Sequence, residues 1–195
     1  MDGLALAAVA TELQALVGGR VDRVAQPEPQ DILLSLRAGG KVVRLLLSAA
    51  PAHSRAHLVE AAPANPPQPH AFCMLLRKRL GGARLLSVTQ PDLDRVLRLE
   101  LEGRSELGDA MAYALVCEIM GKHANIVLVN DEGRVVDAVK RVSLGISSAR
   151  PVLPGLAYEP PPAQGKHNPF TAAQAVFSAV LSGSGRWDKQ LAAGF

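Results

Sequence analysis

Apolar residues recur at helical spacing in two stretches of the chain. Over 4–17, a face that includes Leu6, Leu13 and Leu16 repeats every three or four positions and predicts an N-terminal helix. A second stretch with this spacing covers 70–80. A Gly-Gly pair follows each stretch, and because glycine commonly ends helices, the two pairs predict where both helices stop.

Short apolar runs predict strands over most of the remaining sequence. Gly39-Gly40 and the Asp-Glu-Gly turn at 131–133 predict hairpins, whereas the Pro-, Ala- and His-rich segment 51–69 predicts an extended loop with little regular structure. Seven or eight strands with two helices predict an α+β fold built around an antiparallel sandwich or barrel. The candidate strands are 20–26, 31–37, 41–48, 84–90, 95–102, 112–120, 125–130 and 134–142.

Proline marks the end of the predicted compact domain, with five prolines between Arg150 and Pro162. We expect a domain over 1–155, a Pro-rich linker over 156–167 and a new helical region over 168–195, with Thr171 as the N-cap. A segment as short as 168–195 cannot bury a core alone. We therefore expect an N-terminal piece of a longer protein, and the alternative is a C-terminal helix docked on the main domain.

Composition excludes several classes of protein. Apolar residues make up 48% and charged residues 20% of the chain, which is typical of a globular domain and not of a disordered one. No apolar run is long enough for a membrane span, and Asp2 stands where a secretory signal would carry a cation. Cys73 and Cys117 lie far apart in apolar stretches and are interpreted as reduced core thiols. We expect a cytoplasmic protein with no metal and no cofactor.

Charge permits a nucleic-acid partner without requiring one. Lys and Arg number 21 against 18 Asp and Glu, for a net charge of +3. Aromatic residues make up only 4% of the chain, so a platform that stacks several unpaired bases is not expected. Any nucleic acid should be bound through its backbone and shape.

Three cations, Arg77, Lys78 and Arg79, end the second predicted helix. The helical spacing places Arg79 on the apolar face with Leu76 and Leu80, and turns Arg77 and Lys78 away from it. A cation on such a face extends to the surface or pairs with a carboxylate; the alternative is a fixed cation that lines a phosphate groove.

Two polar turns offer further candidate residues. Strand alternation aligns Arg95 with Leu97 and Leu99, so that Asp94-Arg95 stands at the mouth of an apolar row. A local salt bridge and a functional pair both fit this spacing. In 118–125, Glu118, Lys122, His123 and Asn125 crowd one turn, which fits ordinary turn polarity or a functional turn, although no nucleophile or metal-ligand spacing is nearby.

Taken in order, several motifs resemble the N-terminal domain of the NFACT family, whose bacterial members are often called fibronectin-binding protein A. The resemblance covers roughly 1–162, and 168 onward resembles the start of the family's helix-hairpin-helix-type region. The motifs are LVGGRVDR at 16–23, FCMLLRKRLGG at 72–82, Asp94-Arg95, EIMGKHANIVLV at 118–129, RPVLPG at 150–155 and YEPP at 158–161.

This resemblance implies a role in ribosome-associated quality control. Proteins of the family bind the large ribosomal subunit that carries a stalled peptidyl-tRNA. They recruit tRNA, in bacteria alanyl-tRNA, for a template-free tail on the nascent chain. The family's Asp-Arg pair, associated with tRNA recognition, maps onto Asp94 and Arg95; Arg77, Lys78, Arg79, Lys122 and His123 are further candidates for a nucleic-acid surface. The family's coiled coils are absent here, so weak binding is expected of this piece.

The resemblance also implies two alternatives. The domain is similar in fold to the N-terminal domain of formamidopyrimidine-type DNA glycosylases, whose nucleophile is an N-terminal proline amine followed by glutamate. Asp2 and Gly3 replace those residues, and a shared fold does not transfer chemistry, so we expect no enzyme activity. The family's historical label suggests a surface adhesin instead.

Overall fold

In the computed structural model, which describes residues 1–143, 145, 150–162, 167–182 and 185–194, nine strands form one antiparallel sheet in the order β4-β3-β2-β1-β5-β6-β7-β8-β9. This confirms the predicted α+β class. The strands are β1 Arg20–Ala25, β2 Asp31–Ala38, β3 Lys41–Ser48, β4 Arg55–Val59, β5 Arg84–Thr89, β6 Val96–Arg104, β7 Ala110–Glu118, β8 Asn125–Asn130 and β9 Val135–Ala138. The helices are α1 Gly3–Leu13, α2 Ala71–Leu80, α3 Gln174–Leu181 and α4 Trp187–Gly194, with 3-10 turns η1 Gln14–Leu16, η2 Pro91–Leu93 and η3 Gly121–His123.

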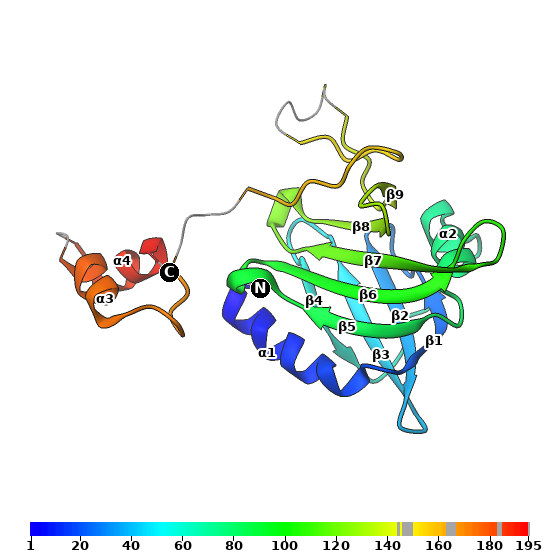
Figure 1. The fold of residues 1–195 in the computed structure, drawn as a ribbon, viewed down its shortest axis with the longest axis horizontal. Helices are drawn as coiled ribbons and strands as arrows, with labels where there is room; N and C mark the ends of the chain where they lie inside the picture. Colours follow the sequence, from blue (N-terminus) through cyan, green and yellow to red (C-terminus); the bar gives the residue numbers. More distant parts are fainter. Residues whose placement is uncertain (144, 146–149, 163–166, 183–184, 195) are drawn as a thin grey trace.

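The sheet folds over so that its two halves enclose one core (Figure 1). Leu34 of β2 and Leu45 of β3 belong to the same buried cluster as Leu99 of β6 and Leu128 of β8. Among the described residues, no strand pairing joins the edge strands β4 and β9. The sheet is therefore folded like a sandwich, as one of the two predicted arrangements, and is not closed into a barrel.

Around β6, β7 and β8 the sheet carries a buried cluster on each face. In β6, Leu97, Leu99 and Leu101 alternate into the main core, as the spacing predicted. On the opposite face, Val96 at the start of β6 packs with Val116 and Val127 in a second buried cluster, whereas Glu102 further along β6 is exposed. This second cluster is covered by the chain after β9, where Val142 and Val152 form a bridge and Val135 donates its backbone N–H to Leu156.

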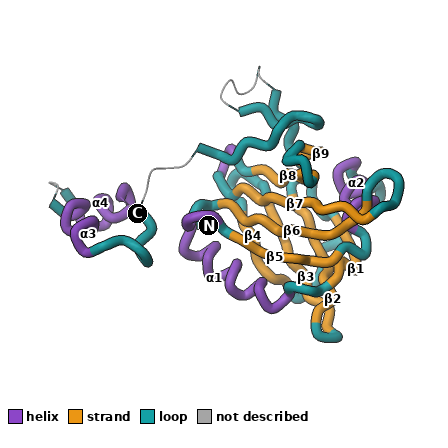
Figure 2. Tube along the Cα trace, viewed as in Figure 1, coloured by secondary structure: helices purple, strands orange, loops and turns teal. Residues whose placement is uncertain are grey.

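Two helices close the main core at different places (Figure 2). Helix α1 buries Leu6 and Leu13 beside β5, and α2 buries Leu76 and Leu80 where it contacts β1 and β6. Both hairpins are confirmed; Gly39 and Gly40 have φ angles of 55° and 77°, as a tight two-residue hairpin turn requires.

The structure corrects the predicted loop over 51–69. This segment contains β4, which pairs with β3 from Arg44↔Val59 to Ser48↔Arg55 and buries Ala56 completely. The composition of the segment concealed the strand because five residues at a sheet edge contribute little apolar periodicity.

The helix boundaries also differ from the prediction. Helix α1 ends at Leu13 and continues as the 3-10 turn η1, which leaves Val17 40% exposed. Ala173, and not Thr171, is the N-cap of α3, because the turn at Asn168 occupies the preceding residues. Helices α3 and α4 pack on each other. Leu156 and Tyr158 lie within the predicted linker, but their backbones are hydrogen-bonded to the β8–β9 hairpin.

A matched pair of leucines tests the position of the core. Leu99 is fully buried and Leu107 is 91% exposed in the β6–β7 hairpin. We expect Leu99→Ala to lower the free energy of unfolding by about 2–5 kcal/mol, because it removes buried methyl groups and leaves a cavity. Leu107→Ala should change it by less than about 0.5 kcal/mol. Urea denaturation of both variants measures this, and equal effects would contradict the described packing.

Candidate nucleic-acid interface

The turn that presents Asp94 and Arg95 has an unusual backbone. Turn η2 connects β5 to β6, and within it Asp92 and Leu93 have positive φ angles of 41° and 59°. Residues other than glycine rarely adopt this region, and such strain persists where the surrounding structure enforces it. Asp94 follows directly, in an extended conformation, and its N–H donates to the Pro91 carbonyl.

The start of the chain enforces this turn. A Cβ atom on Gly3 would lie 2.0 Å from the Leu93 carbonyl oxygen, so the first turn of α1 can approach η2 only with glycine at this position. Gln90 ties the same parts together, since its Nε2 donates to the carbonyls of Gly3 and Asp94, both at 2.8 Å. The Asp2 carboxylate accepts from the Ala5 N–H and caps the helix.

Asp94 and Arg95 have no partner of their own in the described part of the chain: neither side chain forms a hydrogen bond or ion pair there. The local salt bridge weighed from the sequence is therefore not formed. Both residues are half-buried, and Arg95 accepts from the Ile119 N–H through its carbonyl. A carboxylate and a guanidinium are thus held by the backbone while their polar atoms remain available to a ligand.

Lys122 and His123 lie at the same end of the sheet as Asp94 and Arg95. Val96, which follows Arg95, pairs with Glu118, the last residue of β7 (Figure 1). Turn η3 begins three positions after Glu118, at Gly121. Both side chains are exposed. The turn itself is fixed, because the Gly121 N–H donates to Ser54 Oγ.

Lys140 links two strands by hydrogen bonds at this end of the sheet. Lys140 Nζ donates to the carbonyls of Ala49, 2.7 Å away, and Ala124, 2.9 Å away, and so links the end of β3 to the start of β8. Burial lowers the pKa of this ammonium group. The Asn125 side chain and the Lys140 backbone bond to each other in both directions, so Asn125 has a structural role.

Glu118 is structural too, which its place in a polar turn did not reveal. It is 1% exposed, accepts from Arg150 Nη2, and accepts from the Tyr158 hydroxyl at 2.8 Å. Burial raises the pKa of Glu118 above its usual range, while Arg150 and Tyr158 act in the opposite direction. The cluster clamps the segment after β9 onto the outer face of β7.

The three cations of α2 lie at the opposite end of the sheet. Arg79 packs beside Gly103, near the far end of β6, and this strand is roughly 25 Å long. Arg79 is buried and ion-paired with Glu106, as the carboxylate alternative predicted. Arg77, predicted to point away from the apolar face, is half-buried and donates through Nε to the Val24 carbonyl. Lys78 alone of the three is exposed.

Other chemistry finds no support in the residues that the structure describes. No three His, Cys, Asp or Glu side chains gather where they could hold a metal ion. Cys73 and Cys117 are buried free thiols, and burial raises the pKa of both, which disfavours the reactive thiolate. None of the described helices has the length and apolar character that crossing a membrane requires.

The fold and the ordered motifs are those of one family of proteins. Residues 2–195 match the NFACT N-terminal and middle domains, so the chain belongs to the NFACT family. It is 40% identical over 193 residues to the Rqc2 homolog RqcH of Bacillus subtilis. It is 30% identical over 165 residues to the archaeal Rqc2 homolog aRqcH of Methanocaldococcus jannaschii. The matches cover 97% and 83% of this chain but 34% and 23% of those proteins, so the chain spans about a third of the bacterial relative.

Solved structures show the same fold. The N-terminal domain of the fibronectin-binding protein PavA from Streptococcus pneumoniae superposes with a TM-score of 0.91 at 36% identity, covering 100% of this chain and 73% of that one. The fibrinogen binding protein from Staphylococcus aureus gives a TM-score of 0.87 at 33% identity, covering 100% and 69%.

Gly3→Ala tests how the turn is held. The added methyl group would meet the Leu93 carbonyl, so we expect η2 to move and the free energy of unfolding to fall by about 1–3 kcal/mol. Amide NMR shifts of Asp94 and Arg95 should change. Gly145→Ala is the control, since the nearest atom to its Cβ is 3.9 Å away. Unchanged Asp94 and Arg95 shifts in Gly3→Ala would contradict this account.

Tyr158→Phe tests the clamp on Glu118. Because the hydroxyl stabilises the ionised carboxylate, its loss should raise the already raised pKa of Glu118 further. The folded variant then keeps its proton to higher pH, so its stability falls further as pH rises. We expect a loss of about 1–3 kcal/mol at pH 8 and a smaller loss at pH 4, measured by urea denaturation. A loss that is independent of pH would contradict the role of the hydroxyl.

Proposed function

We propose that this chain is the N-terminal tRNA- and large-subunit-binding module of a ribosome-associated quality control factor. The observation that supports it most directly is the Asp94–Arg95 pair, which a strained turn holds with no ion pair of its own in the described residues. The names of the bacterial and archaeal relatives, Rqc2 homologs, supply the biological setting.

The proposed contact follows from the chemistry of the two side chains. A guanidinium group can bond a phosphate or a guanine edge through two parallel N–H groups, and a carboxylate accepts from a base amine. Since the turn already fixes the backbone of both residues, RNA binding has to order their side chains but not the backbone. Lys122 and His123, exposed at the same end, add donors for the RNA backbone.

The burial of the aromatic rings of the β-domain favours a folded RNA over a single strand as its ligand; the exposed rings Phe170 and Trp187 lie in the C-terminal helical region. Phe72 and Tyr113 are buried, and Tyr158 is half-buried against Glu118. With these rings in the core, the β-domain has few surfaces on which unpaired bases could stack. A folded tRNA, bound by charge and shape, suits such a surface.

For the parent protein, we propose recruitment of tRNA, in bacteria alanyl-tRNA, to a large ribosomal subunit that carries a stalled peptidyl-tRNA. The nascent chain would gain a template-free tail there, in the cytoplasm. Further domains of the parent would share the ribosome contacts. This N-terminal piece would contribute tRNA recognition through binding alone, without catalysis and without a cofactor.

A glycosylase-like activity is a weaker candidate. The Asp2 carboxylate accepts from the Ala5 N–H and Gly3 is packed against Leu93, so the first residues serve to build the start of α1. Borohydride trapping on damaged oligonucleotides tests this alternative. Fibronectin binding is favoured by the name of the pneumococcal structural relative, and a solid-phase assay with immobilised fibronectin tests it directly.

Asp94→Ala/Arg95→Ala tests the proposed site. In the longer parent protein, we expect tRNA co-purification and tailing of stalled chains to fall at least about tenfold, because loss of the charge-assisted contacts costs about 1.5–3 kcal/mol. The thermal unfolding midpoint should stay close to wild type, because neither side chain has a bonding partner in the described structure. Glu132→Ala/Arg134→Ala, which removes an exposed pair on the β8–β9 hairpin, is the matched control. Unchanged tailing in the first variant would refute the assignment.

A further inference from the structure

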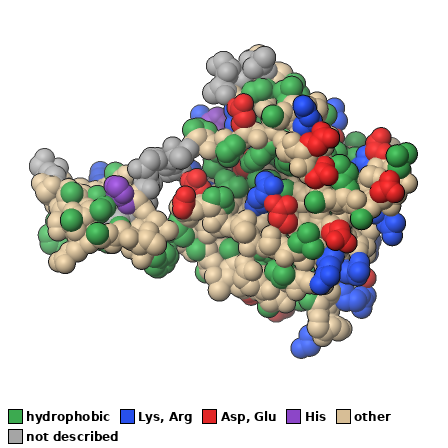
Figure 3. Space-filling view, in the orientation of Figure 1, with side chains coloured by type: hydrophobic (Ala, Val, Ile, Leu, Met, Phe, Trp, Pro, Cys, Tyr) green, Lys and Arg blue, Asp and Glu red, His purple; other side chains and the backbone are tan. Residues whose placement is uncertain are grey.

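Three arginines lie in register across neighbouring strands of the sheet. Arg20 of β1 is paired with Arg37 of β2 on one side and with Arg84 of β5 on the other. Directly paired residues project from the same face, and all three side chains are exposed. We call Arg84, Arg20 and Arg37 the arginine row. Figure 3 shows Lys and Arg side chains gathered over the end of the sheet where β1 lies.

This arrangement works against stability. The Val21 N–H donates to Ala83 and the Leu85 N–H donates to Gly19, so Arg20 and Arg84 form a non-hydrogen-bonded pair. In such pairs the Cα atoms are only about 4.5 Å apart and the side chains are close. Like charges directly opposite each other are destabilising. A fold that places three arginines in register on one face of its sheet needs a reason outside its own stability.

Among the described residues, Arg37 is the one member of the row that forms an ion pair. Arg37 pairs with Asp22 at 3.0 Å, and Arg20 donates to the Gly82 carbonyl at 3.1 Å. Arg84 has neither a hydrogen bond nor an ion pair among the described residues, although Glu102 is its direct neighbour on β6. The row therefore carries a surplus of positive charge that an anionic ligand can use.

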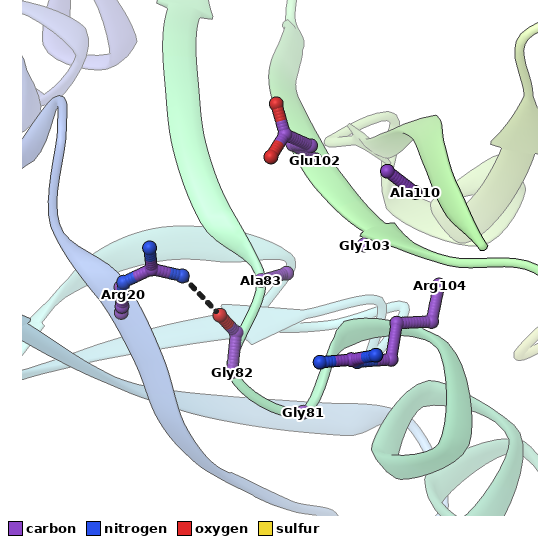
Figure 4. A pocket seen from close by; sticks show the side chains of 8 residues that line it. All are labelled: Arg20, Gly81, Gly82, Ala83, Glu102, Gly103, Arg104 and Ala110. Carbon is purple, nitrogen blue, oxygen red and sulfur yellow. Dashed lines mark hydrogen bonds between the residues drawn. The ribbon is translucent and has the colours of Figure 1, made fainter. Parts of the chain in front are cut away.

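Two neighbouring features extend the row. A second line across β1, β2 and β3 consists of Arg23, Ser35 and Arg44, on the same face of the sheet. At the other side, a pocket of about 150 Å³ is lined by two cations, Arg20 and Arg104, by one carboxylate, Glu102, and by the backbone of Gly81 and Gly82 (Figure 4). One water occupies roughly 30 Å³ in the liquid, so the pocket has room for a larger polar group such as a phosphate.

We propose that the arginine row and this pocket form a second RNA-binding surface, which holds the phosphodiester backbone of a double-stranded RNA segment. A line of guanidinium groups follows a line of phosphates and bonds each one bidentately. An acidic protein partner fits less well, because protein interfaces depend on buried aromatic anchors. No aromatic side chain lines this pocket.

The surface is separate from the Asp94–Arg95 site. Arg84 and Glu102 pair near the far end of β6, whereas Asp94 and Arg95 precede its first residue, so the strand separates the sites by roughly 20 Å. The inference shares with the proposed function the premise that the domain meets RNA, but it does not depend on Asp94 or Arg95. One folded RNA, or two RNA segments, would contact the domain at both ends.

The test compares two double variants of the 195-residue chain. Arg20→Gln/Arg84→Gln removes two charges from the row, and Arg134→Gln/Lys189→Gln removes two exposed charges elsewhere. Dissociation constants are measured against a 16-base-pair RNA duplex of arbitrary sequence and an alanine tRNA transcript, from 50 to 200 mM salt. We expect the row variant to bind both RNAs at least about tenfold more weakly, with a salt slope smaller by about 1.5–2. The control should keep wild-type affinity and slope.

The outcomes separate this surface from the proposed tRNA site. Asp94→Ala/Arg95→Ala should weaken tRNA binding and leave duplex binding unchanged, so each site can fail independently of the other. Equal losses in the row variant and the control would show a net-charge effect and overturn the inference. Displacement of the duplex by polyglutamate at equal charge concentration would overturn it in favour of an acidic protein partner. The row variant should unfold at or above the wild-type temperature, because like-charge repulsion is relieved.

Discussion

Strand β8 is buried on both faces, and this burial constrains the rest of the fold. Its Ile126 and Leu128 enter the main core, and Val127 and Val129 enter the second cluster on the other side. A strand with two apolar faces needs a cover on each, so one half of the sheet folds over the first and the chain after β9 crosses the second. Strand β6 belongs to the same sheet, and its two ends become fixed points to which turns are attached.

Each end of this strand carries a different kind of chemistry. The end at Val96 holds a strained turn, a close approach between Gly3 and Leu93, and two side chains without partners in the described structure. The other end, at Gly103, meets the C-terminus of α2 and the arginine row. Strand β6 keeps these two groups roughly 20 Å apart. Solvent screens the exposed charges of the arginine row and so reduces the cost of placing them in register.

The buried ionic groups, unlike these exposed ones, bond within the protein. Under the covering segment, Glu118 accepts hydrogen bonds from Arg150 and Tyr158, and Arg79 is paired with Glu106. Removal of one member would leave a buried charge exposed to little water, which is why such clusters fix the position of a segment more than they add stability. Of the charged residues first considered for an RNA surface, Arg79 is buried, whereas Lys122 and His123 are exposed at the same end of the sheet as Asp94 and Arg95.

Much of the fold followed from local pattern. The hairpin at Gly39-Gly40, helix α2 and the alternation of β6 depend on neighbouring residues, so local patterns were enough to predict them. The availability of Asp94 and Arg95, the strand β4, the Glu118 clamp and the arginine row were decided by tertiary structure. Each of these depends on which residues meet across strands that are distant in the chain, as Arg20 and Arg84 do. Spacing along a sequence carries no information on such pairing, because the register is set by the packing of the whole sheet.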